Sequence, residues 1–139
     1  MIVSRTDARD RILGPLKTVV DAQSLYAIYD DTEKQPPTTS TISWARVSVR
    51  HRNGRRTSLG RADGKGKHTQ AGFIFVEIYT PREAGLTNSD TYSAAFAEQL
   101  RRFPDGDIWI KDVSEIEVGE DGNWFRVDVI AEFEYDLIQ

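Results

Sequence analysis

The clearest pattern along the chain is a regular alternation of apolar and polar residues near the C-terminus. A period of two is typical of a strand with one buried face. The run predicts a strand of about 13 residues, longer than most, which should be the backbone of an antiparallel sheet. Its inward residues are Phe125, Val127, Val129, Ala131, Phe133, Tyr135 and Leu137. Its outward residues, Trp124, Arg126, Asp128, Ile130, Glu132, Glu134 and Asp136, predict an exposed acidic face.

Four earlier segments also carry strand signals. Residues 43–50 alternate strictly, which predicts a half-buried strand, and residues 25–28 are apolar enough for a short one. Residues 73–81 are apolar at nearly every position, so we expect a central strand covered on both faces and ended by Pro81. The alternation of residues 108–119 slips near Val113, which predicts a bulge before a hairpin turn at residues 120–123.

Two segments have the spacing of amphipathic helices. The first runs from Thr6 to about Val20, with Ser4 or Thr6 as N-cap and a break or kink expected at Gly14-Pro15. The second is capped by the run TNSD (residues 87–90) and extends to about residue 103, before Pro104 and Gly106. Its apolar face consists of Tyr92, Phe96, Leu100 and Phe103.

These elements predict an α+β fold: a mostly antiparallel sheet of about four strands with two main helices packed against it. The length of 139 residues fits a single domain over residues 1–139. Candidate core residues are Trp44, Phe73, Phe75, Phe96, Val127 and Phe133.

Charge is distributed unevenly. Between Arg46 and His68 there are eight Arg and Lys residues against one acid, Asp63, a local net charge of +7. The total is −4, so the rest of the chain carries −11. The turn signal Asn53-Gly54 and three further glycines predict a flexible basic loop over about residues 51–71. Such asymmetry concerns partners more than fold.

The basic segment lacks the marks of a chemical site. A P-loop needs Ser or Thr after its lysine and a helix after the loop, and the run GRADGKGKH has neither. The chain has no cysteine, and its two histidines, both expected in or beside the mobile loop, are too few for a metal site or a catalytic triad. We expect no enzyme, no cofactor and no metal. No apolar run approaches the roughly 20 residues that cross a bilayer, so no membrane partner is expected.

Three interpretations of the basic segment remain. It could bind nucleic acid through phosphates, although it has no aromatic residue for stacking on bases. It could be a solvated hairpin loop. It could also dock on an acidic protein surface, perhaps that of an identical subunit, since the chain itself supplies both signs of charge.

A series of structural motifs resembles the tail terminator proteins of long-tailed phages. In order, these are Trp44 opening a strand, TSLG at residues 57–60, GFIFVEIYTPREAG at residues 72–85, a helix ending in RRF, and a final hairpin GNWFRVDVIAEFEYD at residues 122–136. The resemblance extends from about Ile12 to the C-terminus and contains no catalytic motif.

The resemblance implies a subunit of a hexameric ring that caps the finished tail tube and docks it to the head connector or adaptor proteins. DNA would pass through the lumen without specific binding. The protein would belong to the tail or neck of a virion, phage-like particle or gene transfer agent assembled in the bacterial cytoplasm. A head-closure or head–tail joining protein of the same neck region is the alternative, and a small DNA-binding module is a further one.

Ring assembly is head-to-tail, so each subunit needs two unlike surfaces. We expect the basic segment and the acidic strand face to provide them. The candidate docking residues are Arg50, Arg52, Arg55, Arg56, Arg61, Lys65 and Lys67, with Glu132, Glu134 and Asp136 as acceptors.

Overall fold

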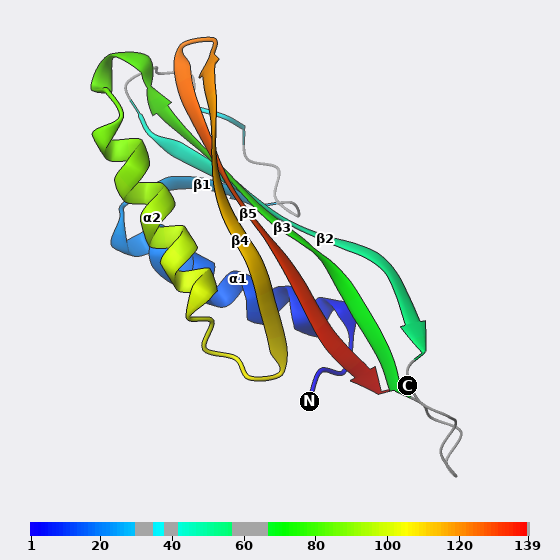
Figure 1. Ribbon diagram of the computed structural model, residues 1–139. Coiled ribbons are helices and arrows are strands. Elements are labelled where there is room, and N and C mark those ends of the chain that lie inside the picture. The colour runs from blue at the N-terminus through cyan, green and yellow to red at the C-terminus, as the bar shows by residue number, and fades with distance from the viewer. Residues whose placement is uncertain (30–34, 38–41, 57–66, 139) are drawn as a thin grey trace.

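The computed structural model of the protein describes residues 1–29, 35–37, 42–56 and 67–138. It confirms the α+β class, with two main helices and a mostly antiparallel sheet (Figure 1). The sheet has five strands in the order β1-β2-β3-β5-β4, one more than predicted. The short strand expected at residues 25–28 is β1 (Tyr26–Tyr29), which pairs in parallel with the start of β2 (Trp44–Arg56) at one edge.

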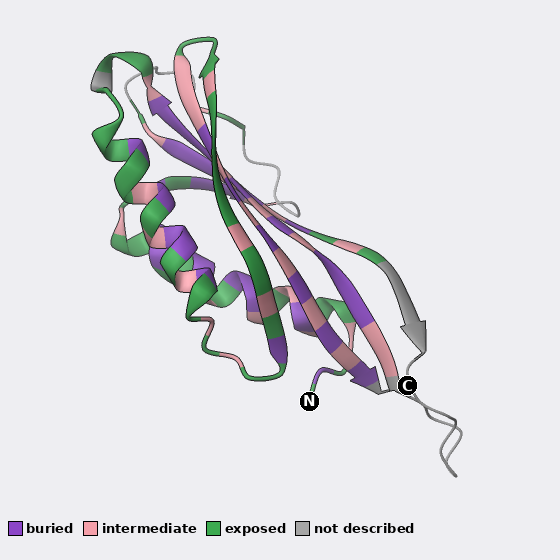
Figure 2. Ribbon diagram, in the orientation of Figure 1, coloured by how far each residue is buried: buried purple, intermediate pink, exposed green. Residues whose placement is uncertain are grey.

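Both helices lie on the same face of the sheet (Figure 1). Helix α1 (Arg5–Ala22) and helix α2 (Thr87–Arg101) bury their apolar sides against the inward residues of the strands. On β5 (Trp124–Ile138) the predicted inward residues from Val127 to Leu137 are all buried, and Phe125 is half-buried. Figure 2 shows the buried residues alternating along the central strands, which confirms the period of two.

Helix α1 begins as expected and continues further than expected. Its N-cap is Ser4, whose Oγ accepts a hydrogen bond from the backbone N–H of Asp7 at 3.0 Å. The predicted break at Gly14-Pro15 is absent, because the helix continues through Pro15 to Ala22. Five buried residues, Ile12, Leu13, Leu16, Val19 and Val20, lie on both sides of the proline, and their packing offsets the hydrogen bond that proline cannot donate.

Helix α2 ends near the predicted place but is capped differently. Its N-cap position is Leu86, and no side chain accepts a hydrogen bond there. The cap predicted from the run TNSD is therefore wrong. The hydroxyl of Ser89 donates to the carbonyl oxygen of Leu86 at 2.9 Å instead of accepting from a backbone N–H. A short 3-10 turn, η1 (Arg82–Ala84), joins β3 to this helix.

The hairpin formed by β2 and β3 (Lys67–Pro81) is longer than predicted. Residues 51–56 and 67–71, which the pattern places in a flexible loop, belong to these two strands. The Asn53-Gly54 turn is also wrong, since both residues lie in β2 where the pairing register shifts between Arg52 and Arg55. A bulge thus accommodates the extra residues and the strand continues. Residues 57–66 lie outside the described residues.

Strand β4 (Ile108–Asp121) contains the predicted bulge. Its pairing with β5 shifts between Lys111 and Ser114, where Asp112 has a positive φ of 54°. A second shift follows at Gly119, whose φ is 106°. The predicted hairpin turn lies between the paired residues Asp121 and Trp124 and uses Gly122 at φ 62°.

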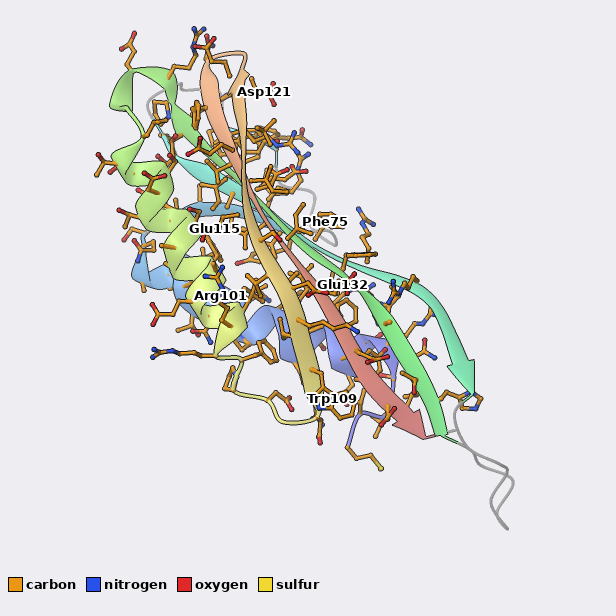
Figure 3. The ribbon with its side chains drawn as sticks, viewed as in Figure 1. Phe75, Arg101, Trp109, Glu115, Asp121 and Glu132 are labelled. Atoms are coloured by element: carbon orange, nitrogen blue, oxygen red, sulfur yellow. The ribbon has the colours of Figure 1, made fainter. Side chains whose placement is uncertain are left out.

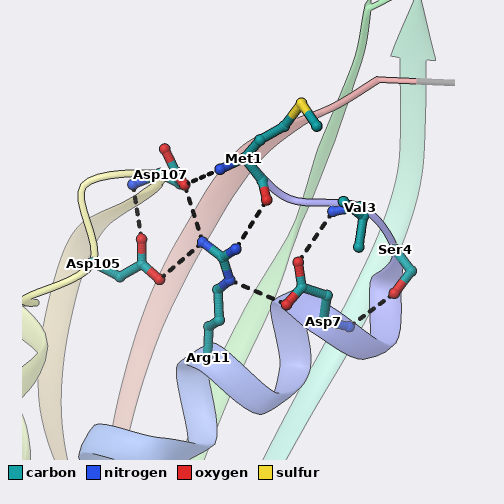
Figure 4. A network of polar contacts seen from close by, with 7 residues as sticks. All are labelled: Met1, Val3, Ser4, Asp7, Arg11, Asp105 and Asp107. Carbon is teal, nitrogen blue, oxygen red and sulfur yellow. Dashed lines mark hydrogen bonds and ion pairs between the residues drawn. The ribbon is translucent and has the colours of Figure 1, made fainter.

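A polar network fixes the N-terminus beside the loop that precedes β4 (Figure 4). The α-amino group of Met1 lies 2.6 Å from a carboxylate oxygen of Asp107. The Arg11 guanidinium donates to Asp107 at 3.0 Å, to Asp7 at 3.1 Å and to the Met1 carbonyl oxygen at 2.9 Å. Both Asp7 and Asp107 have a pKa below the usual value. The largest cause for Asp7 is the hydrogen bond that it accepts from the Val3 N–H, and the largest cause for Asp107 is the hydrogen bond from the α-amino group.

Candidate functional site

The face of the sheet opposite the helices is the most distinctive surface of the described molecule. We call it the open face; it consists of the outward residues of β2, β3, β5 and β4. Figure 3 shows Phe75 and Glu132 on this side, away from α1 and α2. Most of its side chains are half-buried or exposed, in contrast to the fully buried positions that alternate with them (Figure 2).

The strand register arranges the open face in cross-strand rows. We use four of them, each running from β2 through β3 and β5 to β4. They are Arg46–Glu77–Asp128–Ile116, Ser48–Phe75–Ile130–Ser114, Arg50–Phe73–Glu132–Lys111 and Arg52–Ala71–Glu134–Trp109. In three rows an arginine on β2 and a carboxylate on β5 are on either side of a β3 residue.

The charges on this face balance. Four cations and four carboxylates occupy the four rows. Three of the carboxylates lie on β5 and the fourth, Glu77, on β3, so the face as a whole is not acidic as predicted. The neighbouring strands supply the cations that the pattern of β5 alone did not show. Lys111 on β4, for example, lies 3.8 Å from Glu134 on β5.

One end of the open face is a tightly paired aromatic and ionic cluster. Trp44 and Tyr79 stack with ring centroids 4.1 Å apart, and Trp124 meets Trp44 edge-on. Arg126 forms a two-pronged pair with Asp128 at 2.8 and 2.9 Å, which raises the pKa of its guanidinium. Burial, followed by the charge of Glu77, raises the pKa of Tyr79 to about 12. The charged groups of this cluster are paired with one another, although the buried indole Nε1 of Trp44 has no hydrogen-bond partner among the described residues. We place the candidate docking surface in the rows beyond the cluster.

The middle of the open face is apolar. Phe73 and Phe75 were predicted to be core residues, and this is wrong: both are half-buried on the open face, with ring centroids 6.1 Å apart. The physical reason is strand alternation, which sends Ile74, Val76 and Ile78 to the helices instead. The other four predicted core residues, Trp44, Phe96, Val127 and Phe133, are buried.

The structure brings part of the predicted docking set together. Arg50 and Arg52 are exposed on the open face, and the Arg52 guanidinium lies 5.5 Å from the centre of the Phe73 ring. The half-buried acceptors Glu132, Glu134 and Asp136 are on the same face. The basic and the acidic docking residues were expected on two different surfaces of the subunit. Those whose side chains are described all lie on one surface, the open face.

The remaining predicted docking residues are described less fully. Arg55, Arg56 and Lys67 lie in the extended ends of β2 and β3, and only their backbone is described. Arg61 and Lys65 fall outside the described residues. In Figure 1 the ends of β2 and β3 extend beyond the helices, so the described part of the basic hairpin projects from the body.

Sequence reasoning placed Ile130 on the outward face of its strand but did not identify Phe73, Phe75, Lys111 and Trp109 as surface residues. The signal that could have revealed the two phenylalanines is Glu77, which has the same strand phase and would not be expected on a fully covered face. Trp109 and Ile116 are 53% and 46% exposed, although their strand was recognised.

The expectation that His51 lies in or beside a mobile loop is wrong. His51 lies in β2 on the helix-covered face, where its Nε2 is 2.8 Å from the Tyr135 hydroxyl oxygen and its ring meets Phe133 edge-on. Burial lowers the pKa of His51 to about 4, helped by the charges of Arg5 and Arg9. The imidazole is therefore a neutral packing group.

Within the described ranges, no group of three or more His, Cys, Asp or Glu side chains is placed to hold a metal ion. In the same ranges, no helix is both long and apolar enough to cross a membrane.

Comparisons with known proteins support the fold alone. No protein-family model matches the sequence, and no curated protein matches it. The chain is similar to a solved structure of a protein whose name states no function, with a TM-score of 0.60 and 14% sequence identity. The similarity covers 94% of this chain and 95% of that one, so the α+β arrangement is shared from end to end.

Proposed function

We propose that the protein is a tail terminator of a phage or phage-like particle. Six copies would form a ring that caps the tail tube and docks it to the head connector. The order of sequence motifs supports the family, and the α+β fold agrees with the architecture that it implies. The proposal contains no enzymatic step and no cofactor.

The observation that carries the proposal is the basic β2–β3 hairpin, which projects beside a charged and partly apolar open face. Arg50 and Arg52 continue into Arg55 and Arg56 along one strand. The acidic residues of β5 lie two strands away, about 10 Å at the usual spacing. A projecting arm of one charge and a strand of the other suit protein docking better than catalysis.

The test uses electron microscopy of tail tubes from the same particle, mixed with the purified protein. We expect a discrete six-subunit ring at one tube end and an end to further tube growth. Replacing Arg50, Arg52, Arg55 and Arg56 together with Ser should abolish capping. Thermal unfolding should change little, because exposed ion pairs are each worth at most about 1 kcal/mol.

The matched control removes four exposed cations from outside the open face: Lys17, Arg82, Arg101 and Arg102. It should cap tubes normally. Capping by the four-arginine variant would refute the role of the hairpin. Absence of capping by the unmodified protein, combined with duplex binding that falls steeply with salt, would favour the nucleic-acid module instead.

A further inference from the structure

The rows of the open face have a property that a single charged arm would not have. Beyond the aromatic and ionic cluster, Arg50 faces Glu132 across β3, and Arg52 faces Glu134. The arginines of β2 and the carboxylates of β5 therefore lie on either side of β3, each arginine in the same cross-strand row as a carboxylate. A surface of this kind is complementary to itself after a suitable rotation.

The suitable rotation is a two-fold axis that runs parallel to the strands, above β3. It places β2 of one copy over β5 of the other and leaves each residue at its own level along the strand. Arg50 then opposes Glu132 of the second copy, and Arg52 opposes Glu134. A two-fold axis perpendicular to the strands would instead place the arginines of β2 over one another, so the charges select one orientation.

From this arrangement we infer that a second copy of this chain docks on the open face, sheet against sheet, about a strand-parallel two-fold axis. Phe73, Phe75 and Ile130 form the apolar centre of the contact. Aligned sheets pack with their strands within about 30° of each other, so the central rows make the closest contacts. The inference does not depend on the proposed function: it concerns the free protein, whose pairs would have to separate before the same residues could dock in a ring.

The environment of Glu132 supports a cationic partner. This carboxylate is half-buried between Phe73 on β3 and Lys111 on β4. Lys111 contacts Glu134, and no hydrogen bond or ion pair links Glu132 to any of the described side chains. A half-buried carboxylate gains from an added cation, which an opposing Arg50 would provide.

The size of the face suits a weak, reversible pair. Four strands at about 4.8 Å spacing and the residues from Arg46 to Arg52 at about 3.4 Å each give roughly 450 Å² for each copy. Two copies would bury about 900 Å², the size of a weak contact, which is why association should depend on concentration and salt.

The test is the mass of the full chain by analytical ultracentrifugation across concentration and salt. We expect reversible association from 15.8 kDa to twice that mass, weakened by salt. Arg50→Glu and Glu132→Arg should each weaken association about tenfold or more, because each places like charges together twice in the interface. An equimolar mixture of the two variants should recover the two-subunit species. In the mixed pair the introduced glutamate at position 50 opposes the introduced arginine at position 132, and the native Arg50 and Glu132 oppose each other.

Asp10→Arg is the matched control, because Asp10 is exposed on α1, the helix that covers the other face. It should associate like the unmodified protein. Circular dichroism should show that all variants are folded. The inference is overturned if the unmodified protein keeps a single-subunit mass at every concentration, which would assign the face to a different protein. It is also overturned if Arg50→Glu does not weaken association, or if the variant mixture forms a larger species.

Discussion

At the scale of single residues, one glycine determines how the two longest strands fit together. Gly72 on β3 pairs with Phe133 on β5 and with His51 on β2. A Cβ atom there would lie 2.0 Å from the Arg50 carbonyl oxygen and 2.7 Å from Cζ of Phe133. The Phe133 ring thus occupies the space that a side chain would need, and the backbone of β2 closes the other side.

Gly72→Ala should therefore destabilise the protein by about 3 kcal/mol or more, since the contact includes backbone that cannot move freely. Gly14→Ala is the control: a Cβ at Gly14 meets nothing within 4 Å in helix α1, and alanine should stabilise the fold by roughly 0.5–1 kcal/mol. Urea unfolding of both variants measures the difference. Equal effects would show that the Gly72 contact is not tight.

His51 should make stability depend on pH. Its pKa in the folded protein is about 4, against 6.5 for an unperturbed histidine. Between these values the unfolded chain binds a proton that the folded chain does not, so the free energy of unfolding falls as pH drops from 6.5 to 4. We expect a loss of roughly 1–2 kcal/mol, less than the full shift implies because the ring is partly exposed.

His51→Gln should remove this part of the pH dependence while keeping a group that can bond to the Tyr135 hydroxyl. The measurement is urea unfolding of the two proteins at pH 7, 6, 5 and 4.5. If the difference between them does not change with pH, the lowered pKa of His51 is wrong.

At the scale of elements, the two faces of β3 differ in how much their side chains contribute to the stability of the fold. Ile74, Val76 and Ile78 are fully buried below the helices, whereas Phe73 and Phe75 lie on the open face. The alternation defines which residues share a face, but an all-apolar run does not reveal which face is covered.

Phe75→Ala should consequently cost about 1 kcal/mol, whereas Phe133→Ala, at a fully buried position, should cost about 3–5 kcal/mol. Chemical denaturation of both variants provides the comparison. A cost for Phe75→Ala similar to that for Phe133→Ala would mean that Phe75 belongs to the core after all.

Sequence patterns predicted these elements to different degrees. The alternation of β5, the bulge near Val113 and the helical stripes were sufficient to give the α+β class, because each depends on local periodicity. The length of the β2–β3 hairpin was not predictable from Asn53-Gly54, since long-range pairing with β3 outweighed a local turn preference. The composition of the open face depends on register between strands distant in sequence, which no single segment encodes.

At the scale of the whole molecule, Arg11 connects three separate parts of the chain. From the middle of α1 it reaches the N-terminal residue, Asp7 in the first turn, and Asp105 and Asp107 before β4 (Figure 4). Ile2, which follows Met1, is buried and forms an isolated β-bridge with Leu137 near the end of β5. The Arg11 network and this bridge together hold the N-terminal residues against the body of the protein.

Arg11→Gln should make the protein more sensitive to acid. The lowered pKa values of Asp7 and Asp107 contribute stability that is present above the usual value of 3.8 and is lost as pH falls through the folded values. Without the guanidinium we expect the midpoint of acid unfolding to move to higher pH, as followed by circular dichroism. An unchanged midpoint would show that these exposed pairs contribute little.

The two bulges of the edge strand β4 affect whether the sheet can grow by adding strands from other copies. β4 is the long edge of the sheet and exposes Trp109, Ile116 and Val118, which would invite a further strand in a straight ladder. The kinks at Asp112 and Gly119 interrupt its row of unpaired backbone groups, and Glu115 and Glu117 add exposed carboxylates between them. Edge-to-edge growth into fibrils is thereby disfavoured, so a high local concentration of the protein need not lead to strand-by-strand aggregation.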